Sequence, residues 1–534
     1  MRIVTTDEMK DIEKKTWEEY HFNESLIIEN AGVGGADIIS EVFDNAGLTE
    51  EILFLIGKGN NGSDGIAMAR HLVNRGYNCR AFVFFPESDC NPELVKQLEM
   101  AHKFGVKLNY IERTDQVASY FDQMGSGVIV DALFGTGVQL PLSDFMYEVI
   151  ETINDRSTLV FAVDIASGVA GNTGFIRGNA IIADVTLAIG FPKLGYYVSD
   201  GAKRSGIVKT IDVGLPRVMS EQGDKFLLEP SHMMNLMSFR DKFGDKKVFG
   251  HSLVLGGSHG LTGAPALAAS ASLRVGSGLV TAATWEPQYH EMMARLIPEV
   301  MTGYVPLEIN QWPRLIRDLN KYSSIVIGPG LARSTRARRL VLEVLNNFDG
   351  PVIVDADAIN VLNFREDKDA FTMRNAPTVL TPHFGEFCKF TGVAYEKLNE
   401  KPVDYLKDLL DSINCTVVLK GPCTYLGCSD GKVYFNYYPN DGMATGGVGD
   451  VLAGILGGLL GQEPLTKSKL SLSKRYERVN DTVALAVYLH SLSGKIAAED
   501  FGERTMSAAS LIESFPKAFK VIEEKIDSLY RNIG

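Results

Sequence analysis

Short apolar runs alternate with longer stretches of helical periodicity along most of this chain. In its first half the apolar runs are Ile52–Ile56, Arg80–Phe85, Gly127–Val130, Thr158–Val163 and Val185–Ile189. Helical segments lie between them, such as Ile66–Arg75 and Pro92–Phe104. Buried strands that alternate with helices are typical of a parallel sheet covered by helices on both faces. The first half is therefore predicted to be a doubly wound α/β domain.

The same alternation resumes later in the chain. Its apolar runs are Ser252–Leu255, Leu279–Ala283, Ser324–Ile327, Val352–Val354, Val379–Thr381 and Thr416–Leu419. Between the two halves, Arg217 to Pro230 is polar, lacks clear periodicity and ends in proline, which predicts a linker. A chain of 534 residues also exceeds the size of one ordinary domain. We expect two α/β domains, residues 1–225 and 226–534.

Two other segments have a distinct pattern. The chain opens with a predicted helix, because Thr5 and Glu8 have the spacing of a capping box and precede the apolar positions Met9, Ile12 and Trp17. Glu463 to Asn480 is rich in Lys, Arg and Ser, so we expect a solvated surface excursion there.

Composition excludes several classes of partner. The formal net charge of −13 argues against nucleic acid or an anionic membrane as the main partner. The N-terminus lacks the apolar core of a signal peptide, and no apolar run approaches the ~20 residues that span a bilayer. The six cysteines form no C-x-x-C pair, which favours free thiols in a reducing compartment. We expect a cytoplasmic enzyme, and a homo-oligomer.

A glycine-rich turn gives the strongest chemical signal. Ala444-Thr-Gly-Gly-Val-Gly-Asp450 runs directly into the apolar, helix-compatible segment Val451 to Leu460. Backbone N–H groups of such a turn, together with the positive end of a helix, bind phosphate. A carboxylate there repels phosphate, so Asp450 is expected to accept a proton from a hydroxyl that attacks a phosphoryl group. The alternative is that Asp450 is the N-cap of the helix.

Polar residues also follow several strands of the first half. Gly57-Lys-Gly-Asn-Asn-Gly62 fits the G-x-G-x-x-G pattern of a nicotinamide-dependent dehydrogenase. That interpretation is disfavoured, because Asp64 places a negative charge near the pyrophosphate and no good ribose-binding acid follows about 20 residues later. Side-chain oxygens of Asn61, Asp131 and Ser167 suit a hard cation such as K⁺, although each residue taken alone fits a turn or a cap.

These motifs carry a family resemblance. Gly59-Asn-Asn-Gly-Ser-Asp-Gly65, Asp131-Ala-Leu-Phe-Gly-Thr-Gly137 and Val163-Asp-Ile-Ala-Ser-Gly168 resemble the NAD(P)H-hydrate epimerase domain. In the second half, Gly256-Gly-Ser-His-Gly-Leu-Thr-Gly-Ala264, Gly328-Pro-Gly330, Thr381-Pro-His383, Lys420-Gly421 and the turn before Asp450 resemble the NAD(P)H-hydrate dehydratase domain. The order of motifs matches the fused, bifunctional repair family over nearly the whole chain.

The resemblance implies a fold and a set of epimerase residues. It implies a Rossmann-like three-layer sandwich followed by a ribokinase-like domain. In the first domain, Asp164 would be the acid/base residue, and Asn61, Asp131 and Ser167 would hold K⁺. The residues implied to bind the hydrate there are Asn60, Asn61, Gly62, Ser63, Asp64, Gly135, Thr136, Gly137, Val138, Gln139, Leu140, Pro141 and Asp164.

The resemblance also implies the residues of the dehydratase. The hydrate would contact Ala264, Gly330, His383 and Asp450. The adenine nucleotide, ADP with Mg²⁺, would be held by Lys420, Gly421, Pro422, Cys423, Thr424 and Gly449. The C6 hydroxyl of the hydrated nicotinamide ring would be phosphorylated and then eliminated as phosphate, while the epimerase interconverts the R and S forms so that both are repaired.

Three positions depart from the family pattern. Ser63 stands where glycine is usual, Ala166 where proline is usual, and Val448 replaces a small polar residue in the phosphate turn. His383 is also compatible with a simple turn residue. His490 is expected to be a packed helix residue rather than a ligand.

Three alternatives remain open at this point. One is a vitamin or sugar kinase of ribokinase-like fold joined to a Rossmann-like binding module, since that group shares the glycine turn and its aspartate. The second is the dehydrogenase. The third is a non-enzymatic first half that recruits a partner, which the presence of both Asp131 and Asp164 disfavours.

Overall fold

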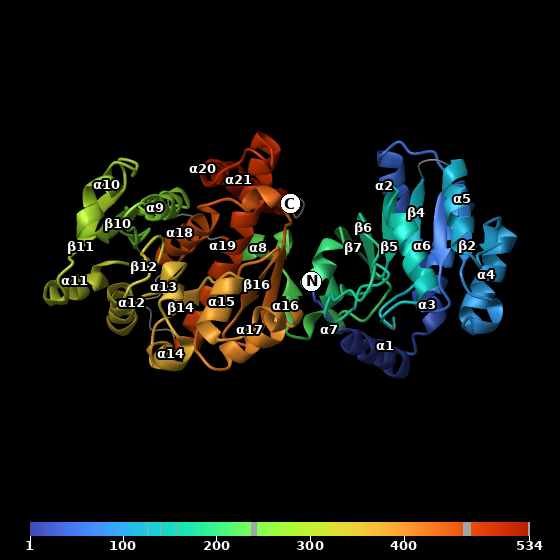
Figure 1. Ribbon diagram of the computed structural model, residues 1–534, viewed down its shortest axis with the longest axis horizontal. Coiled ribbons are helices and arrows are strands. Elements are labelled where there is room, and N and C mark those ends of the chain that lie inside the picture. The colour runs from blue at the N-terminus through green and yellow to red at the C-terminus, as the bar shows by residue number, and fades with distance from the viewer. Residues whose placement is uncertain (125–126, 139, 157, 237–242, 463–470, 532–534) are drawn as a thin grey trace. The chain divides into compact units, whose positions relative to one another are not determined.

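The computed structural model describes residues 1–124, 127–138, 140–156, 158–236, 243–462 and 471–531. Gln139 and residues 463–470 lie outside these ranges. The chain divides into two compact units, Met1–Lys225 and Phe226–Gly534, and each is described here by itself (Figure 1). Among the described helices none is long and apolar enough to cross a membrane.

The first unit is built on a seven-stranded sheet with the order β3-β2-β1-β4-β5-β6-β7. Every neighbouring pair is parallel. The strands are β1 Ile52–Ile56, β2 Cys79–Val83, β3 Lys107–Tyr110, β4 Val128–Ala132, β5 Leu159–Val163, β6 Val185–Ile189 and β7 Ile207–Ile211. The strand order reverses between β1 and β4, which is where ligands bind in sheets of this type. The predicted doubly wound fold is confirmed for this unit.

The two strands that the sequence pattern missed, β3 and β7, are the edge strands of this sheet. Most of their side chains are exposed or half-buried. An edge strand with few buried positions does not need a continuous apolar run, so the signal used for the central strands is absent there.

The described helices of the first unit are α1 Thr6–Tyr20, α2 Glu24–Asn45, α3 Asn60–Asn74, α4 Pro92–Phe104, α5 Thr114–Met124, α6 Asp144–Asn154 and α7 Val218–Glu221. The capping box before α1 is confirmed, since Glu8 N donates to Thr5 Oγ1 at 3.1 Å and Thr5 N to Glu8 Oε2 at 2.6 Å.

α3 begins at Asn60 and not at Ile66, so the polar motif forms its first turns and is not a loop. The glycines of the motif allow close packing on the sheet. A Cβ at Gly62 would lie 2.4 Å from the Gly57 carbonyl oxygen, and one at Gly65 would lie 2.4 Å from the Ala132 Cβ.

The second unit contains a ten-stranded sheet with the order β11-β10-β9-β12-β13-β14-β15-β16-β17-β8. The strands from β11 to β15 are parallel, and β15, β16 and β17 are antiparallel to one another in turn. The bounds are β8 Lys225–Leu227, β9 His251–Leu255, β10 Leu279–Trp285, β11 Met301–Val305, β12 Ser324–Ile327, β13 Val352–Val354, β14 Thr378–Leu380, β15 Thr416–Leu419, β16 Cys423–Gly427 and β17 Val433–Tyr437. The predicted parallel core is confirmed, whereas β8 and α7 fall in the segment expected to be an irregular linker.

The helices of the second unit pack against this sheet and against each other (Figure 1). They are α8 Pro230–Leu236, α9 Gly263–Arg274, α10 Tyr289–Met293, α11 Trp312–Asp318, α12 Thr335–Asn347, α13 Asp357–Asn360, α14 Phe364–Thr372, α15 Phe384–Thr391, α16 Tyr395–Glu400, α17 Pro402–Leu410, α18 Val448–Gln462, α19 Leu472–Phe501, α20 Ala508–Glu513 and α21 Phe515–Arg531.

α19 corrects the expectation of a surface excursion over Glu463–Asn480. The described part of that segment, from Leu472 onward, is helical, and Tyr476 and Val479 are buried. The Tyr476 hydroxyl donates to the Asn414 carbonyl oxygen at 2.5 Å. Buried aromatic and aliphatic side chains among the charged ones therefore anchor this stretch to the unit.

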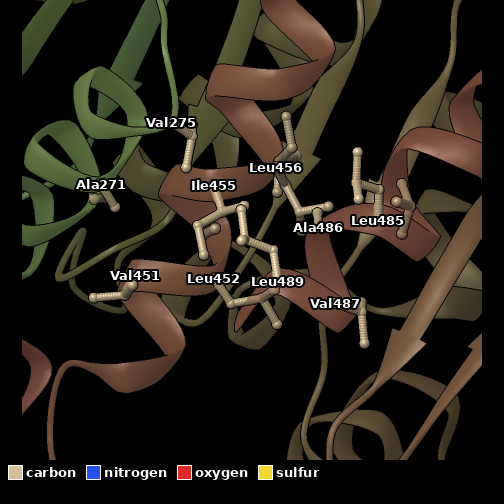
Figure 2. Packing of buried hydrophobic residues seen from close by; sticks show 14 of the residues in the cluster. Ala271, Val275, Val451, Leu452, Ile455, Leu456, Leu485, Ala486, Val487 and Leu489 are labelled. Carbon is tan, nitrogen blue, oxygen red and sulfur yellow. The ribbon is translucent and has the colours of Figure 1, made fainter. Parts of the chain in front are cut away.

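α18 is the central helix of the second unit's core. Its apolar side chains, such as Val451 and Ile455, pack in one cluster with Val275 and with Leu489 of α19 (Figure 2). Glycines on α18 bring its backbone close to its neighbours, because a Cβ at Gly454 would lie 2.2 Å from the Ala268 carbonyl oxygen of α9. The position of the phosphate turn that leads into α18 thus depends on this close contact.

This contact generates a prediction about stability. Gly454→Ala should destabilise the protein by roughly 1–3 kcal/mol, because the added methyl group meets backbone and can be accommodated only by moving α18 away from α9. Gly263→Ala is the matched control on α9: a Cβ there meets nothing within 4 Å, so its stability should be unchanged or slightly higher. Urea unfolding of both variants tests the prediction, and equal midpoints would refute it.

Candidate active sites

A cavity of about 870 Å³ opens above the carboxyl ends of β1, β4 and β5 in the first unit. Of the residues predicted to bind the hydrate, the cavity is lined by Asn60, Asn61, Asp64, Gly135, Thr136, Gly137, Val138, Pro141 and Asp164. Gly62, Ser63 and Leu140 do not line it, and Gln139 lies outside the described residues. The sequence motifs from three strand ends therefore meet at one site.

Asp164 lies at the end of β5 in an unusual conformation. Its φ of +60° is in the left-handed region, which is uncommon for a residue other than glycine and is found disproportionately at functional sites. Its carboxylate forms an ion pair with Lys193, and the Tyr196 hydroxyl donates to its backbone oxygen. Lys193 is 2% exposed and also donates to the Ile189 carbonyl oxygen at 2.8 Å. The fold thus fixes both the backbone and the carboxylate of Asp164.

A second buried aspartate, Asp131, ends β4 beneath the cavity. Its Oδ1 accepts from the Ser167 hydroxyl at 2.7 Å, and its Oδ2 accepts from the Ser167 N–H at 2.8 Å. Burial raises the pKa of Asp131 to about 6, although these hydrogen bonds oppose the shift.

The residues expected to hold K⁺ fit a hard cation in their chemistry. Asn61, Asp131 and Ser167 supply amide, carboxylate and hydroxyl oxygens, the ligand type that such cations prefer. Asn61 is buried, and neither of its side-chain polar atoms has a hydrogen-bond partner among the described residues. A buried amide of this kind needs a partner, and a bound cation would provide one for its oxygen.

Asp64 and Glu13 add two more carboxyl groups to the cavity. Burial and the nearby Asp164 carboxylate raise the pKa of Asp64 well above its ordinary value, with Lys193 opposing. Burial also raises the pKa of Glu13. The first site therefore combines an ion-paired carboxylate with carboxyl groups whose surroundings favour the protonated form.

In the second unit, two glycine loops meet where the strand order reverses between β9 and β12. Gly257 N donates to the Pro329 carbonyl oxygen at 2.8 Å. Gly330 has a φ of +60°, and a Cβ there would lie 2.4 Å from the Leu261 carbonyl oxygen. Ala264 lies in the first turn of α9, directly after this contact. Ala264 and Gly330, two of the four residues predicted to contact the hydrate, therefore lie at the switch point of the sheet.

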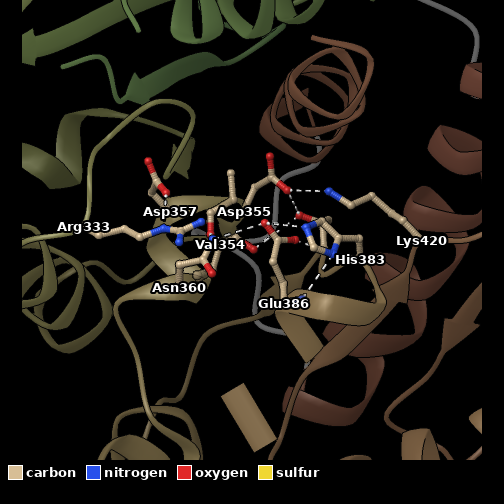
Figure 3. A network of polar contacts seen from close by, with 10 residues as sticks. Arg333, Val354, Asp355, Asp357, Asn360, His383, Glu386 and Lys420 are labelled. Carbon is tan, nitrogen blue, oxygen red and sulfur yellow. Dashed lines mark hydrogen bonds and ion pairs between the residues drawn. The ribbon is translucent and has the colours of Figure 1, made fainter. Parts of the chain in front are cut away.

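A buried polar network follows β13, β14 and β15 (Figure 3). Asp355 is 1% exposed, and its Oδ1 accepts from Thr381 Oγ1 at 2.6 Å and from Lys420 Nζ at 2.9 Å. Burial disfavours the charged form of Lys420, but the carboxylates of Asp355 and Glu386 outweigh it and raise the pKa of the lysine. Lys420 is thus held as a cation at the carboxyl edge of the sheet.

His383 caps α15 beside this network (Figure 3). Glu386 N donates to His383 Nδ1 at 3.2 Å, and His383 N donates to Glu386 Oε2 at 2.9 Å. Its side chain is 60% exposed, so the ring remains accessible to a ligand. His383 therefore both caps α15 and presents its ring at the site.

Asp450 is the third residue of α18, which begins at Val448, so it is not the N-cap. Its carboxylate forms no hydrogen bond or ion pair with the described part of the chain. Burial, and next the Asp355 carboxylate, raise the pKa of Asp450 to about 7, with Lys420 opposing. A Cβ at Gly449 would lie 3.4 Å from Lys420 Nζ, so the lysine lies beside the start of α18.

Other residues at the phosphate turn and at the turn between β15 and β16 have mainly structural surroundings. Gly447 has a φ of +93°, which favours glycine. Val448 is buried in the apolar core, and its carbonyl oxygen lies 3.1 Å from His490 Nε2. His490 is a packed helix residue, as expected, and burial lowers its pKa to about 4. Lys420, Gly421 and Pro422 form the turn between β15 and β16, where Cys423 is buried and Thr424 half-buried.

Comparison with known proteins identifies the family. A family model described as NAD(P)H-hydrate dehydratase matches residues 252–517, and one described as YjeF-related protein N-terminus matches residues 24–195. The bifunctional NAD(P)H-hydrate repair enzyme Nnr of Moorella thermoacetica is 34% identical over 544 residues, covering 99% of this chain and 98% of that protein. The chain belongs to the bifunctional NAD(P)H-hydrate repair enzyme family.

Other relatives are similar over large parts of the chain. The Nnr protein of Thermofilum pendens is 32% identical over 542 residues, which is 99% of this chain and 98% of its own length. A crystal structure of the ADP/ATP-dependent NAD(P)H-hydrate dehydratase from Bacillus subtilis is 28% identical, covers 56% of this chain and 98% of its own, and has a TM-score of 0.47.

Several side chains at these sites were not predicted from the sequence. In the first unit they are Lys193, Tyr196 and Glu13, and in the second they are Asp355, Thr381 and Glu386. For Asp355 a signal existed, because this charged residue directly follows β13, a fully apolar strand. A charge placed at such a strand end in this family is a reasonable site candidate.

The raised pKa of Asp450 generates a prediction about stability and pH. Because the fold favours the protonated carboxyl, the stability that this group contributes is complete below its unfolded pKa of about 3.9 and is lost as the pH rises through about 7. Asp450→Asn carries no charge and should raise Tm at pH 8 but hardly at pH 4.5. Asp357→Asn is the control, because Asp357 pairs with Arg333 at 3.2 Å and should give no gain at pH 8. An equal change in Tm for Asp450→Asn at pH 4.5 and at pH 8 would contradict the prediction.

Proposed function

We propose that this chain repairs hydrated NADH and NADPH, with residues 1–225 acting as the epimerase and residues 226–534 as the dehydratase. The epimerase interconverts the R and S hydrates, and the dehydratase restores NAD(P)H from the S form at the expense of ADP. The observation that carries the proposal is the full-length similarity to bifunctional Nnr proteins, with one polar site in each unit. The acidic charge and the free cysteines support a cytoplasmic enzyme without nucleic-acid or membrane partners, and we expect a homo-oligomer.

In the epimerase, Asp164 is the acid/base residue. It is held by Lys193 and lines a cavity that has room for the nicotinamide end of the substrate. The motifs Asn60–Asp64 and 135–141 bind the hydrate. Asn61, Asp131 and Ser167 would hold K⁺, which would supply a fixed positive charge at this site.

In the dehydratase, Asp450 accepts the proton of the C6 hydroxyl as that oxygen attacks the terminal phosphoryl group of ADP. The backbone N–H groups of Gly446, Gly447 and Gly449 and the start of α18 stabilise the charge on the transferred group. Lys420 adds a positive charge, and its ion pair with Asp355 positions it. Mg²⁺ would arrive with the nucleotide, where phosphate oxygens are its usual ligands.

The other dehydratase residues bind rather than react. Ala264 and Gly330 contact the hydrate at the switch point between β9 and β12, and His383 contacts it from the start of α15. Lys420 to Thr424 and Gly449 contact the nucleotide. The Cys423 side chain is buried, so that residue contributes through its backbone. The C6–O bond then breaks, phosphate departs with that oxygen, and loss of a proton from C5 to the solvent restores the C5=C6 double bond.

A direct assay tests the proposal. The protein is incubated with racemic hydrate and either ADP or ATP, and the absorbance of the restored dihydronicotinamide is followed. Complete conversion of both epimers supports both activities. Conversion of one epimer alone would show that the chain lacks epimerase activity. Phosphorylation of hydroxymethylpyrimidine, pyridoxal or sugars in place of the hydrate would make the chain a kinase.

Asp164→Asn should separate the two activities. Asparagine keeps the shape of the side chain but accepts no proton, so epimerisation should fall by roughly 10²-fold or more. Dehydration of the S epimer should be unchanged. Chiral separation of the epimers measures the first rate, and absorbance measures the second. Unchanged epimerisation would remove Asp164 from the mechanism.

Asp450→Asn should impair dehydration and leave epimerisation unchanged. Turnover of the S hydrate should fall by roughly 10²–10⁴-fold, because the substituted amide accepts no proton. ADP affinity should be unchanged or higher, since a negative charge beside the phosphates is removed. Single-turnover dehydration and ADP titration measure the two effects. An active and stable variant would turn the search for the base to Asp357 and His383.

A further inference from the structure

The cavity of the first unit contains a second aspartate whose surroundings differ from those of Asp164. Asp64 is the fifth residue of α3, is 7% exposed and lines the cavity. Within the described chain its carboxyl group forms no hydrogen bond or ion pair. Because Asp64 lines the cavity, a molecule bound there can supply the hydrogen-bond partner that the fold does not.

The two aspartates approach the cavity from different strands. Asp64 lies on the helix that follows β1, and Asp164 follows β5 directly, while β4 lies between these strands in the sheet. Neighbouring strands are about 4.8 Å apart, so the ends of β1 and β5 are roughly 10 Å apart. A ring bound above the end of β4 would lie between the elements that carry the two residues.

The two groups differ in their contacts. Lys193 forms an ion pair with Asp164, whereas no side chain of the described residues pairs with Asp64. Around Asp64 the charges that matter are Asp164, Lys193, Glu13 of α1 and Glu24 of α2. Burial and the three carboxylates outweigh the lysine and raise the pKa of Asp64. A carboxyl group that keeps its proton beside an ion-paired carboxylate suits an acid and a base in one site.

We propose that Asp64 is a second catalytic residue of epimerisation, acting as the proton donor opposite Asp164. The inference rests on the proposed epimerase function and extends it. When C6 inverts by loss and return of the hydroxyl, the oxygen leaves one face of the ring and an oxygen arrives at the other. A single acid/base group on one side does not serve both faces, whereas Asp64 and Asp164 together do.

Epimerisation then takes place through two proton transfers. The Asp64 carboxyl gives its proton to the C6 hydroxyl, the C6–O bond breaks, and water departs while the N1 lone pair forms a C6–N1 double bond. A water molecule on the other face gives a proton to Asp164, its oxygen bonds to C6, and the electron pair returns to N1. Asp64 is left as a carboxylate and Asp164 as a carboxyl. In the reverse direction the two residues exchange roles, so both epimers are processed.

The test uses the full chain and compares matched variants in water enriched in ¹⁸O. Asp64→Asn replaces a neutral carboxyl with a neutral amide of the same shape, so the variant should fold and should dehydrate the S hydrate normally. Its kcat for epimerisation should fall by roughly 10²-fold or more, with KM changed less than threefold. Glu99→Gln, an exposed substitution on α4, is the control and should match wild type. Wild type should incorporate one ¹⁸O atom at C6 for each inversion beyond the enzyme-free rate.

Several outcomes overturn the inference. Full epimerase activity of Asp64→Asn, or a change confined to KM, would leave Asp64 without a role in proton transfer. A 10²-fold loss in Glu13→Gln with normal activity in Asp64→Asn would assign the donor to Glu13. Inversion without ¹⁸O incorporation would exclude departure of the oxygen. By contrast, absence of epimerase activity in wild type would refute the proposed function itself, so the two failures are distinguishable.

Discussion

Each unit places a lysine at the carboxyl ends of its parallel strands, fully buried in the first unit and partly buried in the second, and an ammonium group withdrawn from water needs a carboxylate partner. Lys193 pairs with Asp164 in the first unit, and Lys420 pairs with Asp355 in the second. In both cases the partner follows a buried strand, so the ion pair ties the polar edge of the sheet to its apolar centre. Removing one partner would leave an uncompensated buried charge, which is among the most costly defects in a protein. The geometry of both sites depends on these pairs.

The two ion pairs serve different purposes within the same architecture. In the first unit the pair includes Asp164, the carboxylate proposed to react, and fixes its position. In the second unit the pair leaves the expected base, Asp450, without a partner and directs the lysine toward the phosphate turn. Close packing of α18 on α9 completes that arrangement, since the glycines of the helix set the distance of the turn from the sheet.

Much of this organisation could be predicted from the sequence, and the failures have physical reasons. Central strands such as β1 and β12 are buried throughout and almost entirely apolar, so their positions were predicted closely. The edge strand β7 has few buried side chains and gave no such signal. The start of α3 was misplaced because its glycines suggested a loop, whereas they permit close packing on β1 and β4. Lys193 was missed because its importance arises from a contact between two separate strand ends.

The pKa of Asp450 has one more consequence, for the thermodynamics of nucleotide binding. A diphosphate placed beside this carboxyl group favours its protonated form still further. Near neutral pH the group is only partly protonated, so binding of the nucleotide is coupled to uptake of a fraction of a proton from the solution. For a nucleotide bound at the proposed position, affinity should therefore increase as the pH falls through 7, whereas the proposed transfer of the hydroxyl proton to Asp450 needs the unprotonated carboxylate. Nucleotide binding and turnover should then have opposite pH dependences near neutrality.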